Sequence, residues 1–174
     1  DIFDICVGFN DGKTSVFKNK ELGNINIMTF NGPDKYIRIK QYPSGNPAID
    51  DYLLLHKQEL LDRKSAKFTE DNWFKWARGN FDLIDERKGQ KCVYVAQLRR
   101  REGEPVAKMG KVDYFKGMLM MRPKNSNMSV AYINKIINYI NSNDFQMNYR
   151  FSGRFKIGQN VLSNHILPNN LLKI

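Results

Sequence analysis

Tyr149-Arg150-Phe151-Ser152-Gly153-Arg154-Phe155-Lys156-Ile157-Gly158 places three cations among three aromatic side chains, with two glycines and no acidic residue. Cations, rings and a flexible backbone together suit a surface that holds a phosphate chain and stacks on bases. A loop whose aromatics pack inward while its charges are solvated would have the same composition. The rest of the chain has to decide between these two interpretations.

Positive charge is concentrated in the second half of the chain. Residues 88–174 carry 15 Lys/Arg against 4 Asp/Glu, whereas residues 1–87 carry 13 against 14. No acidic residue follows Asp144. A half-chain this basic repels itself unless it meets a polyanion, so a nucleic acid or an acidic surface is the expected partner.

The composition indicates a single folded domain, 1–174, in a reducing compartment. Its 41% hydrophobic content excludes a disordered chain and allows a real core. Cys6 and Cys92 stand far apart with no supporting histidine cluster, so we expect free thiols and no metal site. No apolar run is long enough to span a membrane and no signal peptide is visible, which favours a cytoplasmic protein. Because the chain enters a strand-like run directly at Asp1, we expect a piece of a longer protein.

Hydrophobic periodicity predicts an α+β fold with a mostly antiparallel, twisted sheet and packed helices. Apolar residues at helical spacing predict helices around 47–64 and 130–150, which begin at the capping residues Asn46 and Ser129. β-rich runs between turn signals predict the strands. These runs are 2–7, 25–30, 36–41, 91–101, 106–109, 111–114 and 118–121.

Two of the predicted strands present basic side chains in an ordered way. In 36–41, Arg38 and Lys40 alternate with isoleucines and form a basic face. In 91–101, Gln97, Arg99 and Arg101 project to one side and Arg100 to the other. Arginine and glutamine can bond base edges in pairs, although a fully solvated hairpin tip is the alternative. The candidate DNA-binding residues are Lys13, Arg38, Lys40, Gln97, Arg99, Arg100, Arg101, Tyr149, Arg150, Arg154 and Lys156.

Three further motifs favour structural roles. Gly12-Lys13-Thr14 ends like a phosphate-binding loop, but the first glycine of that motif is misplaced and Ser15-Val16-Phe17 favours a strand over the required helix. His56 lies on the apolar stripe of its predicted helix, which indicates a packing residue. The cluster Trp73–Trp76 is expected to anchor a connector against the core.

The order of these segments resembles a family of DNA-modifying enzymes. Gly8–Phe17 is similar to the entry into the target-recognition region of restriction-modification N6-adenine DNA methyltransferases, of the TaqI-like or related type II and IIG kind. Asn46-Pro47, the helix after it and Leu61-Asp62-Arg63 resemble a helix of that region, and Trp73-Phe74 stands where such proteins carry an aromatic pair. Ser152–Gly158 is similar to their closing element. The resemblance covers nearly the whole chain.

The resemblance implies a target-recognition domain that is not itself catalytic. The chain lacks the Pro-Pro-aromatic motif that holds the flipped adenine and the Phe-x-Gly-x-Gly motif for S-adenosylmethionine. A methyltransferase domain in cis would supply that cofactor and flip the base, and this domain would close over the other side of double-stranded DNA. Lys13, Arg150, Arg154 and Lys156 would then contact phosphates, and Gln97–Arg101 would read base edges.

The sequence is also compatible with two other functions. Pro33-Asp34 and Glu86-Arg87-Lys88 together imitate the metal site of a Mg²⁺-dependent nuclease, although Glu-x-Lys is common by chance. A basic module that binds an acidic protein is the second alternative. The salt dependence of duplex binding separates that module from a DNA-binding domain.

Overall fold

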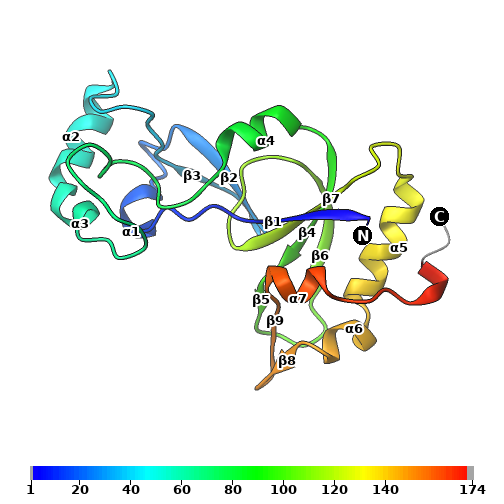
Figure 1. Cartoon of the computed structure of the whole chain (residues 1–174). Coiled ribbons are helices and arrows are strands. Elements are labelled where there is room, and N and C mark those ends of the chain that lie inside the picture. The colour runs from blue at the N-terminus through cyan, green and yellow to red at the C-terminus, as the bar shows by residue number, and fades with distance from the viewer. Residues whose placement is uncertain (1, 172–174) are drawn as a thin grey trace. The chain divides into compact units, whose positions relative to one another are not determined.

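The structure, a computed structural model that describes residues 2–171, confirms the α+β fold (Figure 1). The chain forms two compact units. Unit 1 comprises Asp1–Gly8 and Asp82–Ile174, and unit 2 comprises Phe9–Phe81. None of the helices within residues 2–171 combines the length and apolarity that crossing a membrane requires.

A four-stranded antiparallel sheet of order β1-β7-β4-β6 forms the centre of unit 1. Its strands are β1 (Phe3–Val7), β4 (Lys91–Ala96), β6 (Ala107–Lys111) and β7 (Met118–Pro123). In the central pair, Val93 lies opposite Met121 and Val95 opposite Leu119. Both central strands are buried along almost their whole length, which explains why their sequences are continuously apolar rather than alternating.

Helix α5 (Val130–Asn141) covers one face of this sheet. The Ser129 hydroxyl accepts the amide of Tyr132 at 3.1 Å and caps the helix, as expected. The isoleucines at 133, 136, 137 and 140 are buried against the sheet, and each contributes about 1.5–3 kcal/mol by leaving water. At the end of the helix, the Asn141 side chain accepts the amides of Val106 and Ala107, both at 2.8 Å. The helix is therefore fixed to the start of β6.

Short elements complete unit 1. They are α4 (Phe81–Arg87, which starts at the last residue of unit 2), α6 (Asn143–Met147), α7 (Gln159–Ser163) and the 3₁₀ turn η1 (Asn169–Leu171). A second sheet contains β5 (Leu98–Arg99), β8 (Arg150–Phe151) and β9 (Arg154–Lys156) in the order β5-β9-β8.

The prediction of one strand over 91–101 is wrong, because the chain changes sheets at Gln97. The Gln97 amide faces the Gly117 carbonyl at 3.5 Å, whereas its carbonyl accepts the amide of Ile157 at 3.1 Å. The first half of the segment is therefore β4, and the second half is β5 in the small sheet. The predicted strand 111–114 is also wrong beyond Lys111, where β6 ends.

Unit 2 combines a hairpin with short helices. Its elements are α1 (Thr14–Phe17), β2 (Ile25–Thr29), β3 (Gly32–Tyr36), α2 (Pro47–Leu55) and α3 (Lys57–Leu61). The predicted helix 47–64 is thus interrupted at His56. The His56 ring contacts the Tyr52 ring in a tilted arrangement, with 4.7 Å between the ring centroids. Its Nδ1 forms a hydrogen bond with the Glu59 carboxylate at 2.9 Å.

Two strand predictions in unit 2 are wrong. Residues 15–17 are helical, because the Asp11 carboxylate accepts the Lys13 amide at 2.7 Å and the Thr14 hydroxyl, and so stabilises a turn. The strand predicted at 36–41 instead ends at Tyr36, because β3 begins directly after the turn at residues 30–31. Residues 37–41 have no regular structure, but Ile37 and Ile39 are still buried.

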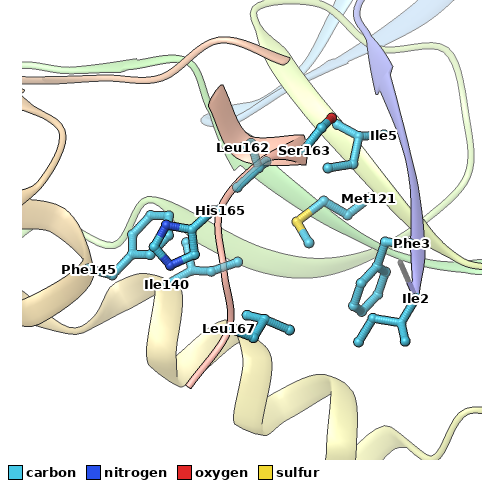
Figure 2. A pocket seen from close by; sticks show the side chains of 10 residues that line it. All are labelled: Ile2, Phe3, Ile5, Met121, Ile140, Phe145, Leu162, Ser163, His165 and Leu167. Carbon is cyan, nitrogen blue, oxygen red and sulfur yellow. The ribbon is translucent and has the colours of Figure 1, made fainter. Parts of the chain in front are cut away.

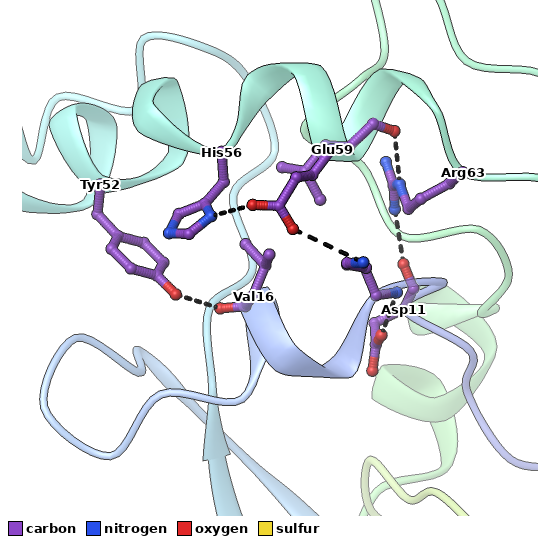
Figure 3. A network of polar contacts seen from close by, with 8 residues as sticks. Asp11, Val16, Tyr52, His56, Glu59 and Arg63 are labelled. Atoms are coloured by element: carbon purple, nitrogen blue, oxygen red, sulfur yellow. Dashed lines mark hydrogen bonds and ion pairs between the residues drawn. The ribbon is translucent and has the colours of Figure 1, made fainter.

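Arg63 is the polar centre of unit 2 (Figure 3). Its side chain is only 7% exposed, and its guanidinium donates to the carbonyls of Leu60 at 2.7 Å, Asp11 at 2.6 Å and Trp73 at 2.5 Å. Burial lowers the pKa of Arg63 to about 10, against the opposing influence of Asp11. The expected anchoring role of the aromatic cluster is confirmed, since Trp73 and Phe74 are both buried.

Candidate nucleic-acid interface

A tight turn joins β8 to β9. Its two central residues are Ser152, with φ 51°, and Gly153, with φ 74°. Positive φ at both positions is the signature of a type I′ turn, whose twist matches that of the flanking strands. A Cβ on Gly153 would meet nothing within 4 Å, so the backbone conformation rather than space favours glycine there.

Strand pairing decides which side chains this hairpin exposes. Phe151 lies opposite Arg154, and Leu98 lies opposite Lys156. Because paired residues share a face of a sheet, and residues two apart do as well, these four side chains lie on one face. All four are exposed, Phe151 at 63% and Leu98 at 47%. We call Leu98, Phe151, Arg154 and Lys156 the hairpin face.

The opposite face of the small sheet belongs to the core of unit 1. Phe155 is fully buried and, with Ile157 just beyond the strand, joins the cluster that contains Leu162 and the isoleucines of α5. The stretch 149–158 therefore combines inward packing with an exposed, basic face. Of its three aromatic side chains, Phe155 is buried, Tyr149 is partly buried, and Phe151 is exposed on the same face as Arg154 and Lys156.

Two predicted DNA-binding residues of the hairpin are engaged inside the protein. Arg150 lies opposite Phe155, and its Nη2 donates to Gln146 Oε1 at 2.9 Å and to the Arg101 carbonyl at 3.4 Å. Its Nε is buried and has no hydrogen-bond partner among the described residues. Tyr149 is partly buried, and its hydroxyl contacts His165 Nδ1 at 2.5 Å. Both residues hold the hairpin in place.

The structure brings the second predicted segment, 97–101, beside the hairpin. Strand β5 pairs directly with β9, and Arg99 lies opposite Phe155. Arg99 Nε donates to the Pro105 carbonyl at 3.3 Å, whereas Arg100 and Arg101 are exposed. The two basic segments therefore lie side by side in the small sheet, although Arg99 and Arg150 stand opposite the buried Phe155 and not on the hairpin face.

The remaining predicted residues, Lys13, Arg38 and Lys40, belong to unit 2. Lys13 forms an ion pair with Glu59 at 3.6 Å. The Arg38 guanidinium lies 3.5 Å above the centre of the Phe81 ring, and Lys40 is exposed. Within residues 2–171, neither Arg154 nor Lys156 of the hairpin face forms such an ion pair.

A residue that the sequence did not single out lies beside an apolar pocket of unit 1 (Figure 2). The cavity, of about 200 Å³, is lined mainly by aliphatic and aromatic side chains together with His165 and Ser163. The Tyr139 hydroxyl contacts His165 Nε2 at 2.8 Å, and the Tyr149 hydroxyl contacts Nδ1. Both ring nitrogens are thus occupied, which favours a structural role. In the sequence, the only sign of this structural role is the position of His165 beside apolar residues near the end of the chain.

Burial of His165 should make the fold sensitive to acid. Burial lowers the pKa of His165 below its ordinary value of 6.5, so the unfolded chain takes up a proton there before the folded protein does. We therefore expect the free energy of unfolding to fall as the pH drops below 6.5. The contribution of His165 to this fall should end below its folded-state pKa, where the residue is protonated in both states. Urea unfolding at pH 7.5 and pH 5.5 measures the difference.

The matched variants are His165→Asn and His56→Asn, because the chain has two histidines and His56 lies in unit 2. The first should reduce the stability difference between the two pH values, and the second should leave it in place. An undiminished difference in His165→Asn would contradict the assignment.

The acidic residues and cysteines that the sequence offered for a metal site lie apart from one another or bond other groups. No cluster of three or more His, Cys, Asp or Glu side chains is placed to hold a metal ion within residues 2–171. Asp34, of the nuclease-like pattern, accepts from Lys18 Nζ at 2.8 Å. Cys6 and Cys92 are free thiols, as expected, and burial raises the pKa of Cys92 to about 12.

The sequence matches no protein-family model and no curated protein.

Proposed function

We propose that the chain is a double-stranded DNA recognition domain that meets the duplex with the hairpin face and the adjoining Arg100 and Arg101. One observation supports the proposal: β5 pairs with β9, which brings the two most basic segments of the chain side by side. On the hairpin face, cations stand next to an exposed aromatic ring.

The underside of the hairpin explains why its outer face is available for a ligand. Phe155 and Ile157 supply the buried contacts that fix the strands, and the type I′ turn fixes their register. Phe151, at 63% exposure, contributes little to the core. An exposed ring beside Arg154 suits a surface that combines phosphate contacts with stacking or apolar contacts to the nucleic acid.

The cations of the hairpin face and those of the loop after β5 suit different contacts with DNA. Arg154 and Lys156 project from a rigid strand and suit phosphate contacts, which fix the register of a protein on the duplex. Arg100 and Arg101 stand on the loop that leaves β5, and an arginine can make two hydrogen bonds to a guanine edge. Gln97 is partly buried, and the hydrogen bonds at the change of sheets use its backbone, so its side chain stays a candidate for base contacts.

The resemblance of the sequence supports a narrower form of the proposal. In this form the chain is the target-recognition domain of a cytoplasmic, N6-adenine-specific DNA methyltransferase of a restriction-modification system. A catalytic domain in cis would hold S-adenosylmethionine and transfer the methyl group, while this chain would select the site. No methyl-transfer step is assigned to residues of this chain.

The experiment that tests DNA binding is a titration of a labelled 20-base-pair duplex at 50 and 200 mM salt. If Arg154 and Lys156 each neutralise a phosphate, the fourfold rise in salt should weaken binding about tenfold or more. Polyglutamate serves as a competitor of the same charge sign. Absent binding at 50 mM salt, salt-independent binding, or equal competition by polyglutamate would overturn the proposal, and the last result would favour an acidic protein as partner.

A further inference from the structure

Unit 2 contains a basic pocket that is separate from the hairpin face. Arg38, Lys40 and Lys75 line a hollow of about 260 Å³, and the aromatic rings of Trp76 and Phe81 form part of its wall. Every one of these residues lies within Phe9–Phe81, so the pocket is complete within one compact unit.

The pocket is built around an arginine that is already held in place. The Asn24 side chain accepts the Arg38 amide at 2.8 Å and donates to the Arg38 carbonyl at 2.7 Å. The guanidinium lies 3.5 Å above the Phe81 ring centre, an arrangement that orients it and leaves its edges available as donors. Beside the Phe81 ring, at 5.6 Å between ring centroids, the Trp76 indole is fixed by a hydrogen bond from its Nε1 to the Ile37 carbonyl at 3.0 Å.

The three cations of this pocket have no internal counter-ion. Unit 2 is described in full, and no Asp or Glu is among the residues that line the hollow. Three carboxylates of the same unit have other partners: Asp34 pairs with Lys18, Glu70 pairs with Lys57, and Asp50 accepts the Ser44 amide. Three like charges around one hollow repel one another, so an anion that enters it is stabilised by all three.

We propose that this pocket binds a phosphate group. The Arg38 guanidinium can bond two phosphate oxygens in parallel, and Lys40 and Lys75 act as mobile point charges at the rim. A water occupies ~30 Å³ of liquid, so the hollow has room for a phosphate group with several of its waters. The phosphate can belong to a DNA backbone or to a small free molecule, and the site does not depend on the hairpin face.

The test uses the whole chain and the fluorescence of Trp76. Trp73 is 2% exposed and does not line the pocket, so binding should change the emission of Trp76. We expect a saturable change on addition of inorganic phosphate or a 20-base-pair duplex at constant ionic strength. Lys40→Ala/Lys75→Ala should weaken it by about tenfold or more. The matched control is Lys20→Ala/Lys64→Ala, which removes two exposed lysines of the same unit that do not line the pocket.

Each outcome has a distinct meaning. A response to the duplex alone assigns a backbone phosphate, and a response to inorganic phosphate assigns a small ligand; both support the site. No response to either probe, or a response that Lys40→Ala/Lys75→Ala leaves intact, overturns it. Arg154→Ala/Lys156→Ala should keep the response to inorganic phosphate, so failure of the hairpin face and failure of the pocket can be told apart.

Discussion

Replacement of Arg63 by methionine is expected to lower the free energy of unfolding by about 3–5 kcal/mol. The guanidinium is buried and donates to three backbone carbonyls, from Leu60, Asp11 and Trp73. Methionine fills a similar volume but leaves all three acceptors buried without a donor, and each unpaired group costs about 1–3 kcal/mol. Urea unfolding followed by tryptophan fluorescence measures the loss, because both tryptophans belong to unit 2.

Lys64→Met is the matched control, because Lys64 is the next residue along the chain and is exposed. It should change the free energy of unfolding by no more than about 0.5 kcal/mol. Arg63→Lys should fall between the two, since a single ammonium cannot reach three carbonyls in the directions that the planar fork does. A loss below about 1 kcal/mol in Arg63→Met would show that the three bonds contribute little.

Elements whose signals are local could be predicted from the sequence. Helix α5 combines a 3.6-residue apolar period with a Ser129 cap, and both signals lie within the helix itself. The same holds for the start of α2, where the Asn46 side chain accepts the amides of Ala48 and Ile49. The apolar run 118–121 was likewise predicted as a strand, and it lies within the buried strand β7.

Features that depend on distant partners could not be predicted. The change of sheets at Gln97 is set by Gly117 and Ile157, which the local pattern of 91–101 does not contain. The contact between Arg63 and the Asp11 carbonyl joins residues 52 positions apart. Arg63 in particular looks in the sequence like a solvated cation at the end of a helix, and only the fold shows that it is buried.

In the candidate interface too, local features could be predicted from the sequence, whereas features that depend on distant residues could not. Exposure of Arg154 and Lys156 and burial of Phe155 agree with simple alternation along a strand. The inward engagement of Tyr149 and Arg150 depends on His165 and Gln146, which come from other elements. Pairing of β5 with β9 was not predicted, because it joins segments that are far apart in the sequence.

Removal of both hairpin cations, in Arg154→Ala/Lys156→Ala, is expected to weaken duplex binding for all sequences alike. Contacts to phosphates carry no sequence information, so the slope of log K against log salt should fall in magnitude by about two. The fold should persist, because both side chains are exposed and the buried Phe155 between them is kept. Lys111→Ala/Lys135→Ala removes the same charge from other exposed positions of unit 1 and should change the slope less.

Substitution of the neighbouring arginines, in Arg100→Ala/Arg101→Ala, should instead change which duplexes are preferred. If these side chains read base edges, each lost contact costs about 1–3 kcal/mol at the positions that it reads and little elsewhere. Selection from a randomised duplex pool with the original chain and with the variant measures the preference directly. An unchanged preference with uniformly weaker binding would place these arginines on phosphates, and recognition of the target would then have to reside in other residues. Each of the two double variants loses two positive charges. A difference in selectivity between them therefore cannot arise from net charge alone.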